Sequence, residues 1–226
     1  MFSFSGCAAH VKRAHHGGGV YHTVGKGETL WRICRAYGVS LQEVAEINNI
    51  KDPTDIAAGM RVFIPGARSV KKVVPYSPDG RKRDSEGVVE AEDGGAEERP
   101  VVEKGRFQWP VKGEVISSFG IRNGVMHDGI DIRADEGAPI AAADEGEVVF
   151  ESASMRGYGK IVILSHKDGF FTVYAHNKEN LVKRGGKVSI GDIIARVGDT
   201  GNATVSHLHF EVRRGKSTRN PLFFLP

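Results

Sequence analysis

The chain has 226 residues, 31 of them Lys or Arg and 28 Asp or Glu, with a formal net charge of +3 at pH 7; this length fits one large or two modest domains. So small a charge does not indicate nucleic-acid binding, although a mild positive bias suits an anionic wall polymer. No run approaches the roughly 18 apolar residues of a membrane span, and two cysteines cannot define a disulfide framework.

The N-terminal segment, residues 1–19, contains the run Phe4-Ser5-Gly6-Cys7, which resembles the end of a bacterial lipoprotein signal. Only six residues precede Cys7 and none is basic, whereas an export signal has about 15–30 residues and a charged start. We therefore expect the natural start to lie upstream of Met1, with Cys7 as the lipidation site of a truncated signal. The alternative is a chance Ser-Gly-Cys.

Residues 20–66 are predicted to form a small α+β domain with the order βααβ. Apolar residues recur at helical spacing over 30–37, and Gly38 is suited to end that helix. Ser40 and Glu43 form a capping box at the start of a second helix. Short strands should open and close the domain.

This domain resembles a LysM module. Its opening matches residues 25–31, Gly-Lys-Gly-Glu-Thr-Leu-Trp, and its second half matches Asn48-Asn49-Ile50. The resemblance implies binding of glycans that contain N-acetylglucosamine, in peptidoglycan or chitin, between the loop after the first strand and the loop before the last. Leu30 and Ile56 also fit the core. The residues predicted to bind glycan are Gly27, Glu28, Thr29, Leu30 and Ile56.

Residues 67–106 show no sustained apolar periodicity, with a basic first half and an acidic second half. Such a composition does not bury enough apolar surface to become ordered, so we predict a flexible linker. A linker of this kind keeps the following domain near the bound glycan and raises its effective concentration there. An autoinhibitory linker that covers the following domain's site is the alternative.

Residues 107–226 are predicted to be all-β. Short alternating runs bounded by turn residues indicate antiparallel strands, and Lys167-Asp168-Gly169 is suited to a hairpin. Near that turn, His166 is predicted to be structural, and Tyr174 either contacts a substrate or packs. The predicted strands are 115–118, 147–151, 160–165, 170–176, 193–197 and 206–213.

The last predicted strand carries two histidines. Alternation places His207, His209 and Glu211 on one face, which we expect to be solvated, and three apolar residues on the other. Histidines presented together suit zinc, which in catalytic sites takes three protein ligands and keeps one position open for water. Glu211 either supports these histidines or is simply solvated.

A second pair, His127 and Asp131, lies four residues apart in the sequence. Four residues of extended strand span roughly 13 Å at about 3.3 Å each, which is too far for two ligands of one ion. The intervening Asp128-Gly129 favours a tight turn because glycine tolerates positive φ. A bend there brings His127 toward Asp131, and a set of histidine and carboxylate ligands suits zinc.

The ordered motifs resemble the lysostaphin and LytM-type zinc endopeptidases of the M23 peptidase family. The motifs are His127-x-x-x-Asp131, Tyr174-Ala175-His176 and His207-Leu208-His209, with further matches at 109–113, 117–120, 129–131 and 220–222. The resemblance implies an antiparallel sheet with zinc (Zn2+) in a groove across it. It also implies His127, Asp131 and His209 as the metal ligands. One departure is Val205, where the family commonly has glycine, and it bears on the shape of that loop.

The same resemblance implies that His176 and His207 are catalytic. Zinc lowers the pKa of bound water to about 7, and histidine can take a proton and return it to the leaving amine. We assign His207 as the base and His176 to substrate positioning and oxyanion stabilisation, although the two roles are interchangeable on the sequence.

These features predict an endopeptidase that binds peptidoglycan and hydrolyses its peptide cross-links in the cell envelope. Membrane attachment would occur only through lipid at Cys7, in the periplasm or at the outer membrane. The combination of modules also resembles murein hydrolase activators of the NlpD type, so the alternative is a non-enzymatic activator of a cell-wall amidase in cell division. Activators of that type have typically lost metal ligands, and all five motif residues are intact here.

Overall fold

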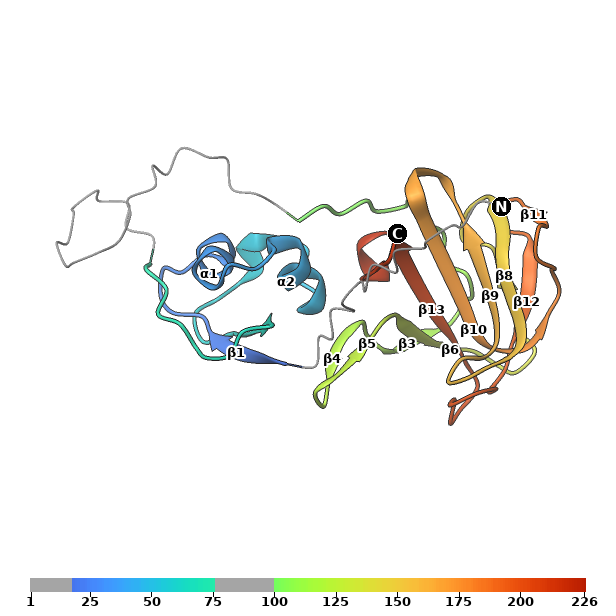
Figure 1. Cartoon of the computed structure of the whole chain (residues 1–226), viewed down its shortest axis with the longest axis horizontal. Coiled ribbons are helices and arrows are strands. Elements are labelled where there is room, and N and C mark those ends of the chain that lie inside the picture. Colours follow the sequence, from blue (N-terminus) through green and yellow to red (C-terminus); the bar gives the residue numbers. More distant parts are fainter. Residues whose placement is uncertain (1–17, 76–99) are drawn as a thin grey trace, which may run out of the picture.

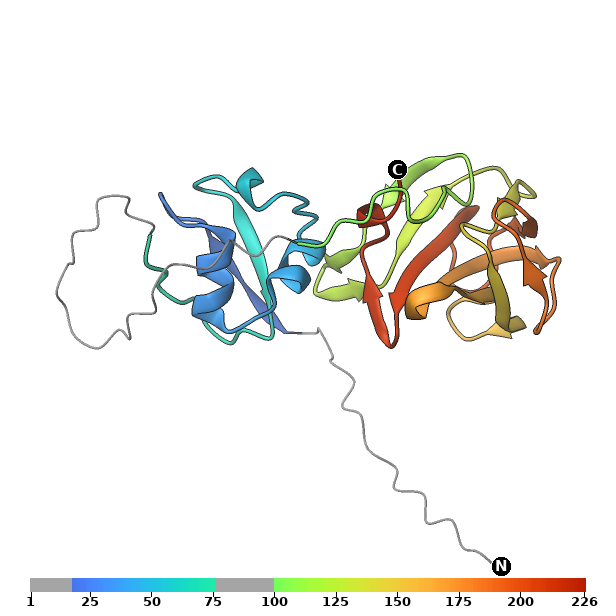
Figure 2. The same ribbon diagram turned by 90° about the horizontal axis from the view of Figure 1, so that it is seen from above.

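The computed structural model describes residues 18–75 and 100–226. Cys7 and most of the predicted linker lie outside the described residues, so the lipidation site and the flexibility of the linker stay predictions. Two units lie side by side in both views of the chain (Figures 1 and 2). We call them the small domain, from Gly19 to Pro65, and the β domain, from Glu114 to the C-terminus.

The small domain is a two-stranded antiparallel sheet with two helices between its strands, which confirms the predicted α+β order. Thr29 caps the first helix by accepting a hydrogen bond from the Arg32 N–H, and Gly38 ends it at φ 69°. Ser40 caps the second helix in the same way. The elements are β1 (Gly19–Thr23), α1 (Leu30–Tyr37), α2 (Leu41–Ile47), η1 (Pro53–Asp55) and β2 (Arg61–Pro65).

The β domain is a mostly antiparallel sheet, as predicted, in the order β11-β8-β9-β10-β13-β6-β3, with β12, β14 and β7 attached to this path and β4-β5 forming a separate hairpin. Each predicted strand is present within a few residues, and the turn at 167–169 joins β9 to β10. The elements are β3 (Glu114–Ser117), β4 (Gly120–Arg122), β5 (Val125–His127), β6 (Ile130–Arg133), β7 (Pro139–Ala141), β8 (Gly146–Met155), β9 (Gly159–Ser165), η2 (Lys167–Gly169), β10 (Phe170–Asn180), β11 (Lys187–Val188), β12 (Ile193–Val197), β13 (His207–Arg214), β14 (Ser217–Arg219) and η3 (Pro221–Phe223).

The β domain's apolar core lies under the central strands. Tyr174 is fully buried there, and its hydroxyl is hydrogen-bonded to the Ala143 N–H at 2.9 Å, so it packs and does not reach a substrate. His166 is also buried, and its ring nitrogens lie 2.7 Å from the Glu145 carbonyl and from the Thr172 hydroxyl, in agreement with a structural role.

The two domains are in contact. The buried cluster of the β domain includes Ile47 at the end of α2 and Phe63 of β2. The segment that enters the β domain is held by the same helix, because the Val101 N–H donates to Gln42 Oε1 at 2.6 Å. Figure 1 shows the β4-β5 hairpin on the side of the sheet that faces the small domain.

Candidate metal centre

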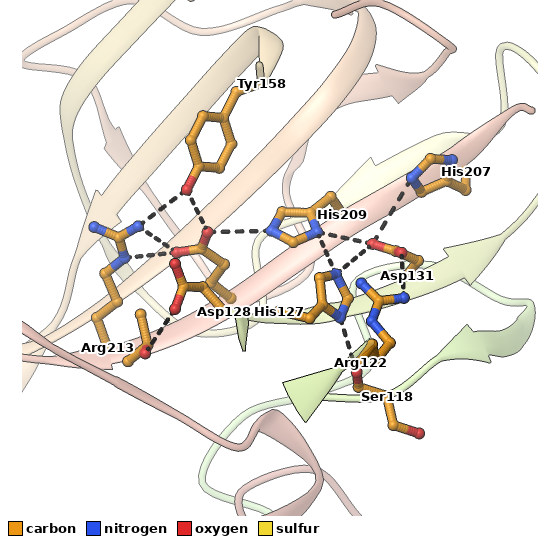
Figure 3. Close-up of polar contacts among 11 residues, drawn as sticks. Ser118, Arg122, His127, Asp128, Asp131, Tyr158, His207, His209 and Arg213 are labelled. Atoms are coloured by element: carbon orange, nitrogen blue, oxygen red, sulfur yellow. Dashed lines mark hydrogen bonds and ion pairs between the residues drawn. The ribbon is translucent and has the colours of Figure 1, made fainter. Parts of the chain in front are cut away.

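Three side chains from three neighbouring strands converge at the surface of the sheet. The ligand atoms of His127 (β5), Asp131 (β6) and His209 (β13) all lie within 4.8 Å of one another. Asp131 Oδ1 is 2.8 Å from His209 Nδ1 and 3.1 Å from His127 Nε2, and these two nitrogens are 3.2 Å apart (Figure 3). Two imidazoles and one carboxylate therefore point at one position, and together they could hold a metal ion.

Strand pairing brings two of these side chains together. His209 lies directly opposite Asp131 in the register of β13 and β6, and residues so paired have side chains on the same face. His127 arrives from the β4-β5 hairpin, where it pairs with Gly120. The chain then turns at Asp128-Gly129 before β6 begins at Ile130.

The bend is where we predicted it, but our reason for the glycine was wrong. Gly129 is not among the glycines with positive φ. Its backbone lies against β13 so closely that an added Cβ would be 2.3 Å from the Phe210 carbonyl oxygen. Glycine is needed there because no side chain fits between the bend and the strand.

Each of the two imidazoles of the cluster is held by a hydrogen bond from the ring nitrogen that faces away from the cluster. His127 Nδ1 donates to the Ser118 carbonyl at 2.8 Å, so its Nε2 keeps the lone pair and faces the cluster. His209 is held the other way round, with Nε2 3.1 Å from Glu211 Oε1 and Nδ1 toward Asp131. Such outer hydrogen bonds fix the tautomer and ring orientation that a metal ligand needs.

His207 and His176 lie beside the cluster. Their ring centroids are 4.8 Å apart, and His207 Nε2 is 3.7 Å from Asp131 Oδ1. Each Nδ1 donates to a backbone carbonyl, of Val205 at 2.8 Å and of Thr200 at 2.7 Å. Both Nε2 atoms therefore keep a lone pair that can accept a proton.

The backbone at His176 is strained. Its φ is 64°, a value that non-glycine residues seldom adopt, and the β9-β10 ladder shifts register between Ala175 and Asn177. The His176 N–H donates to the Tyr158 carbonyl at 2.9 Å, which holds the kink. The kink turns the imidazole toward His207 in place of the strand's regular alternation.

Glu211 corrects our expectation that its strand face is solvated. Its side chain is completely buried, and His207 and His209 are each only 7% exposed. The Glu211 carboxylate accepts hydrogen bonds from the Tyr158 hydroxyl at 2.9 Å and from Arg213 Nε at 2.6 Å, besides that of His209. The carboxylate thus supports the cluster, which is one of the two roles left open by the sequence.

The electrostatics favour ionised carboxylates beside a cationic site. Burial raises the pKa of Asp131, but the adjacent His127 and His209 imidazoles outweigh it and hold this pKa far below its usual range. Burial lowers the pKa of His209, but its bonds to Asp131 and Glu211 outweigh that and raise it to about 9. A positive charge is therefore strongly favoured between these two carboxylates, and a divalent ion bound there would replace the proton.

The cluster lies in an open cleft of about 380 Å³. Residues of the hairpin, of the bend after it and of two loops of the β domain also line the cleft. Apart from Asp128 of the predicted bend, the sequence did not single them out, and Gly157 and Tyr158 lie far from every motif. They are Arg122, Met126, Asp128, Gly157, Tyr158, Asn202, Ala203 and Thr204.

A second cleft, of about 300 Å³, lies on the small domain. Four of the five predicted glycan-binding residues line it and Gly27 does not, while the side chain of Leu30 is fully buried in the core. The Glu28 carboxylate accepts hydrogen bonds from the Gly25 N–H at 2.7 Å and from His22 Nε2 at 2.8 Å, so it shapes the loop. The lining residues are Glu28, Thr29, Leu30, Trp31, Pro53, Thr54 and Ile56.

Comparison with known proteins identifies two modules. The family model of peptidase family M23 matches residues 125–221, and that of the LysM domain matches residues 22–65. The lipoprotein YgeR of Escherichia coli is 36% identical over 211 residues, which are 93% of this chain and 82% of that protein.

Two further comparisons each cover about half of this chain. The murein hydrolase activator NlpD of Escherichia coli is 42% identical over 121 residues, 53% of this chain and only 31% of that protein. The crystal structure of the catalytic domain of EnpA, a prophage-encoded M23 protein from Enterococcus faecalis, is 33% identical. The match covers 48% of this chain and 88% of that domain, with a TM-score of 0.46.

Proposed function

Because the chain belongs to the family of NlpD- and YgeR-like cell-envelope proteins that join a LysM domain to an M23 peptidase domain, we propose that it is a zinc endopeptidase that cuts peptide cross-links of peptidoglycan. One observation carries the proposal. Three ligand atoms converge on one position, and two further imidazoles beside them keep free Nε2 atoms.

We propose His127, Asp131 and His209 as the ligands of zinc. Two imidazole nitrogens and a carboxylate oxygen are zinc donors, and three protein ligands leave a position for water. Zinc bound there would supply a water activated near neutral pH and would polarise the scissile carbonyl.

The remaining chemistry belongs to His207 and His176. Nε2 of His207 lies 3.7 Å from Asp131 Oδ1, so we assign His207 the role of base. Nε2 of His176 is then left to orient the substrate carbonyl and to stabilise the oxyanion.

We further propose that the cleft of the LysM domain binds the glycan strand. Glu28, Thr29, Leu30 and Ile56 line it, and Trp31 adds an aromatic wall beside Thr54. An aromatic ring next to polar groups suits the apolar face and the hydroxyls of a sugar.

The place of action that we propose is the cell envelope, with lipid attached at Cys7. The similarity to a protein named as a lipoprotein supports it. Among residues 18–75 and 100–226, no helix is long and apolar enough to cross a membrane.

A second candidate is activation of a cell-wall amidase, without turnover by this chain. The 42% identity to a protein named as a murein hydrolase activator favours it. The complete set of five motif residues favours the peptidase.

The test is digestion of purified peptidoglycan by the full chain with zinc, analysed by mass spectrometry, beside His207→Ala and His209→Ala. We expect new uncrosslinked peptides with the wild type only, with zinc retained by His207→Ala and lost by His209→Ala. Equal metal content and activity in all three proteins would contradict the assignment. Zinc binding without products would favour the activator, to be tested by adding cell-wall amidases.

A further inference from the structure

The end of α2 in the LysM domain contacts two places connected to the ligand His127: Gly120, which pairs with it, and Arg219, whose neighbour Thr218 is hydrogen-bonded to Asp128. From these contacts we infer that the LysM domain positions the metal site, with Glu46 and Ile47 holding the hairpin that carries His127. The inference rests on the metal site proposed above, but it concerns residues of the other domain.

The first contact is between backbones. The Ile47 carbonyl oxygen lies so close to Gly120 that an added Cβ on this glycine would be 2.5 Å away. Gly120 pairs directly with His127 in the β4-β5 hairpin. The Ile47 side chain is buried in the same apolar cluster as Phe119, which precedes the hairpin, and Ile130, which follows the bend after His127. A shift of α2 away from the β domain would therefore remove contacts that hold β4 and β5 in place.

The second contact is polar and buried. Glu46 is only 3% exposed, and its Oε1 accepts a hydrogen bond from Arg219 Nε at 2.7 Å. Its Oε2 accepts from the Asn220 N–H at 3.2 Å, and its backbone carbonyl accepts from Asn220 Nδ2 at 3.0 Å. A buried carboxylate is tolerated only where its donors are in place, so these bonds set one docked geometry.

This second contact also leads to His127. Arg219 is the last residue of β14, and the adjacent Thr218 hydroxyl donates to Asp128 Oδ1 at 3.2 Å. Asp128 directly follows His127 in the bend. The end of α2 thus acts on His127 from two sides, through Gly120 on the paired strand and through Asp128 in the bend.

Such an arrangement couples docking to metal binding. If docking holds His127 in the position suited to a metal ion, undocking lowers the affinity of the site. Thermodynamic reciprocity then requires that a bound ion strengthen the docking by the same factor.

The test compares the zinc dissociation constants of full-length variants by chelator competition, at a temperature where circular dichroism shows each to be folded. Glu46→Ala should weaken zinc binding by about five-fold or more, the lower end of typical coupling between sites. The double variant Glu46→Arg, Arg219→Glu restores the ion pair but not the acceptor for the Asn220 N–H, and should recover part of the affinity. The control is Asp55→Ala, which removes an exposed carboxylate of the same domain and should bind zinc like the wild type.

Hydrogen exchange separates this inference from the proposed function. Without metal, the amides of residues 120–127 should exchange faster in Glu46→Ala than in the wild type. In the wild type, zinc should also slow exchange at the end of α2. Wild-type zinc affinity and unchanged hairpin exchange in Glu46→Ala would overturn the inference. If the wild type binds no zinc, the proposed function fails, and the metal-free exchange alone decides whether α2 positions the hairpin.

Discussion

The carboxylate of Glu211 is surrounded by hydrogen-bond donors. His209 Nε2, the Tyr158 hydroxyl and Arg213 Nε all point to it, and the side chain has no contact with solvent. A carboxylate offers only acceptors, so it satisfies every partner at once. Its charge also favours a cation on the other side of the His209 ring.

We predict that Glu211→Gln weakens zinc binding by roughly 10- to 100-fold, the usual effect of losing an outer partner of a metal ligand. The amide nitrogen of glutamine would face one of the donors and leave it unsatisfied. Chelator competition measures the effect, and Glu147→Gln on an exposed position of β8 is the matched control. Equal affinities of the two variants would show that Glu211 does not orient His209.

His166 provides a test by pH. Burial lowers its pKa, so the folded protein keeps this imidazole neutral. The pKa of this histidine in the unfolded chain is about 6.5. As the pH falls below that value, the unfolded chain binds a proton at His166 that the folded protein does not bind. Stability is therefore complete above this pH and is lost as the pH falls toward the lowered folded pKa, with a slope of up to about 1.4 kcal/mol per pH unit.

The measurement is urea unfolding between pH 7.5 and pH 5 in the presence of a chelator, for the wild type and His166→Gln. The variant should be less stable at neutral pH and should show the shallower loss on acidification. Parallel profiles would mean that His166 does not account for the acid sensitivity.

Among the secondary-structure elements, the bend between β5 and β6 brings together the side chains that we propose as metal ligands. The short strands β5 and β6, which the bend joins, carry His127 and Asp131, and β13 carries His209 opposite Asp131. The bend can approach β13 only because Gly129 has no side chain to meet the Phe210 carbonyl.

We predict that Gly129→Ala destabilises the protein by about 1–3 kcal/mol and also weakens zinc binding, because the bend must move away from β13. The comparison is Gly124→Ala, in the turn of the β4-β5 hairpin. There the added Cβ meets nothing within 4 Å but φ is 78°, so only the backbone penalty of about 1–2 kcal/mol applies. Urea unfolding and chelator competition distinguish the two effects. A loss of zinc affinity as large in Gly124→Ala would contradict the close-approach argument.

At the scale of the whole molecule, the LysM domain is docked on the β domain. Ile47 and Phe63 are buried in the core of the other domain, and Glu46 is paired with Arg219 across the interface. Breaking such a buried pair costs about 3–5 kcal/mol, so we predict that the domains stay docked when the covalent connection between them is cut.

A specific protease site inserted after Gly80 tests this. After cleavage of the folded protein, the two fragments should still elute together in size-exclusion chromatography at micromolar concentration. The same cleavage in a Glu46→Ala background should release them, because a loss of about 3–5 kcal/mol weakens association by more than a hundredfold, at about 1.4 kcal/mol per tenfold. If the wild-type fragments eluted separately, the LysM domain would be held to the β domain by the covalent linker and not by the interface.

Short-range patterns in the sequence were enough to predict the helices, the central strands and the candidate ligands. Helical spacing and capping residues predicted α1 and α2, alternation predicted the central strands, and the ordered motifs brought out His127, Asp131 and His209. These signals are local, because a cap, a turn or an alternating run depends on residues only a few positions apart.

The surroundings of those residues follow from long-range contacts in the folded chain. Glu46 and Arg219 are 173 positions apart and belong to no shared pattern. The burial of Glu211 depends on Tyr158 and Arg213, and the need for glycine at 129 depends on a carbonyl of another strand. Burial and close approach arise from segments that meet only in the folded chain, so no periodicity or spacing along the sequence records them.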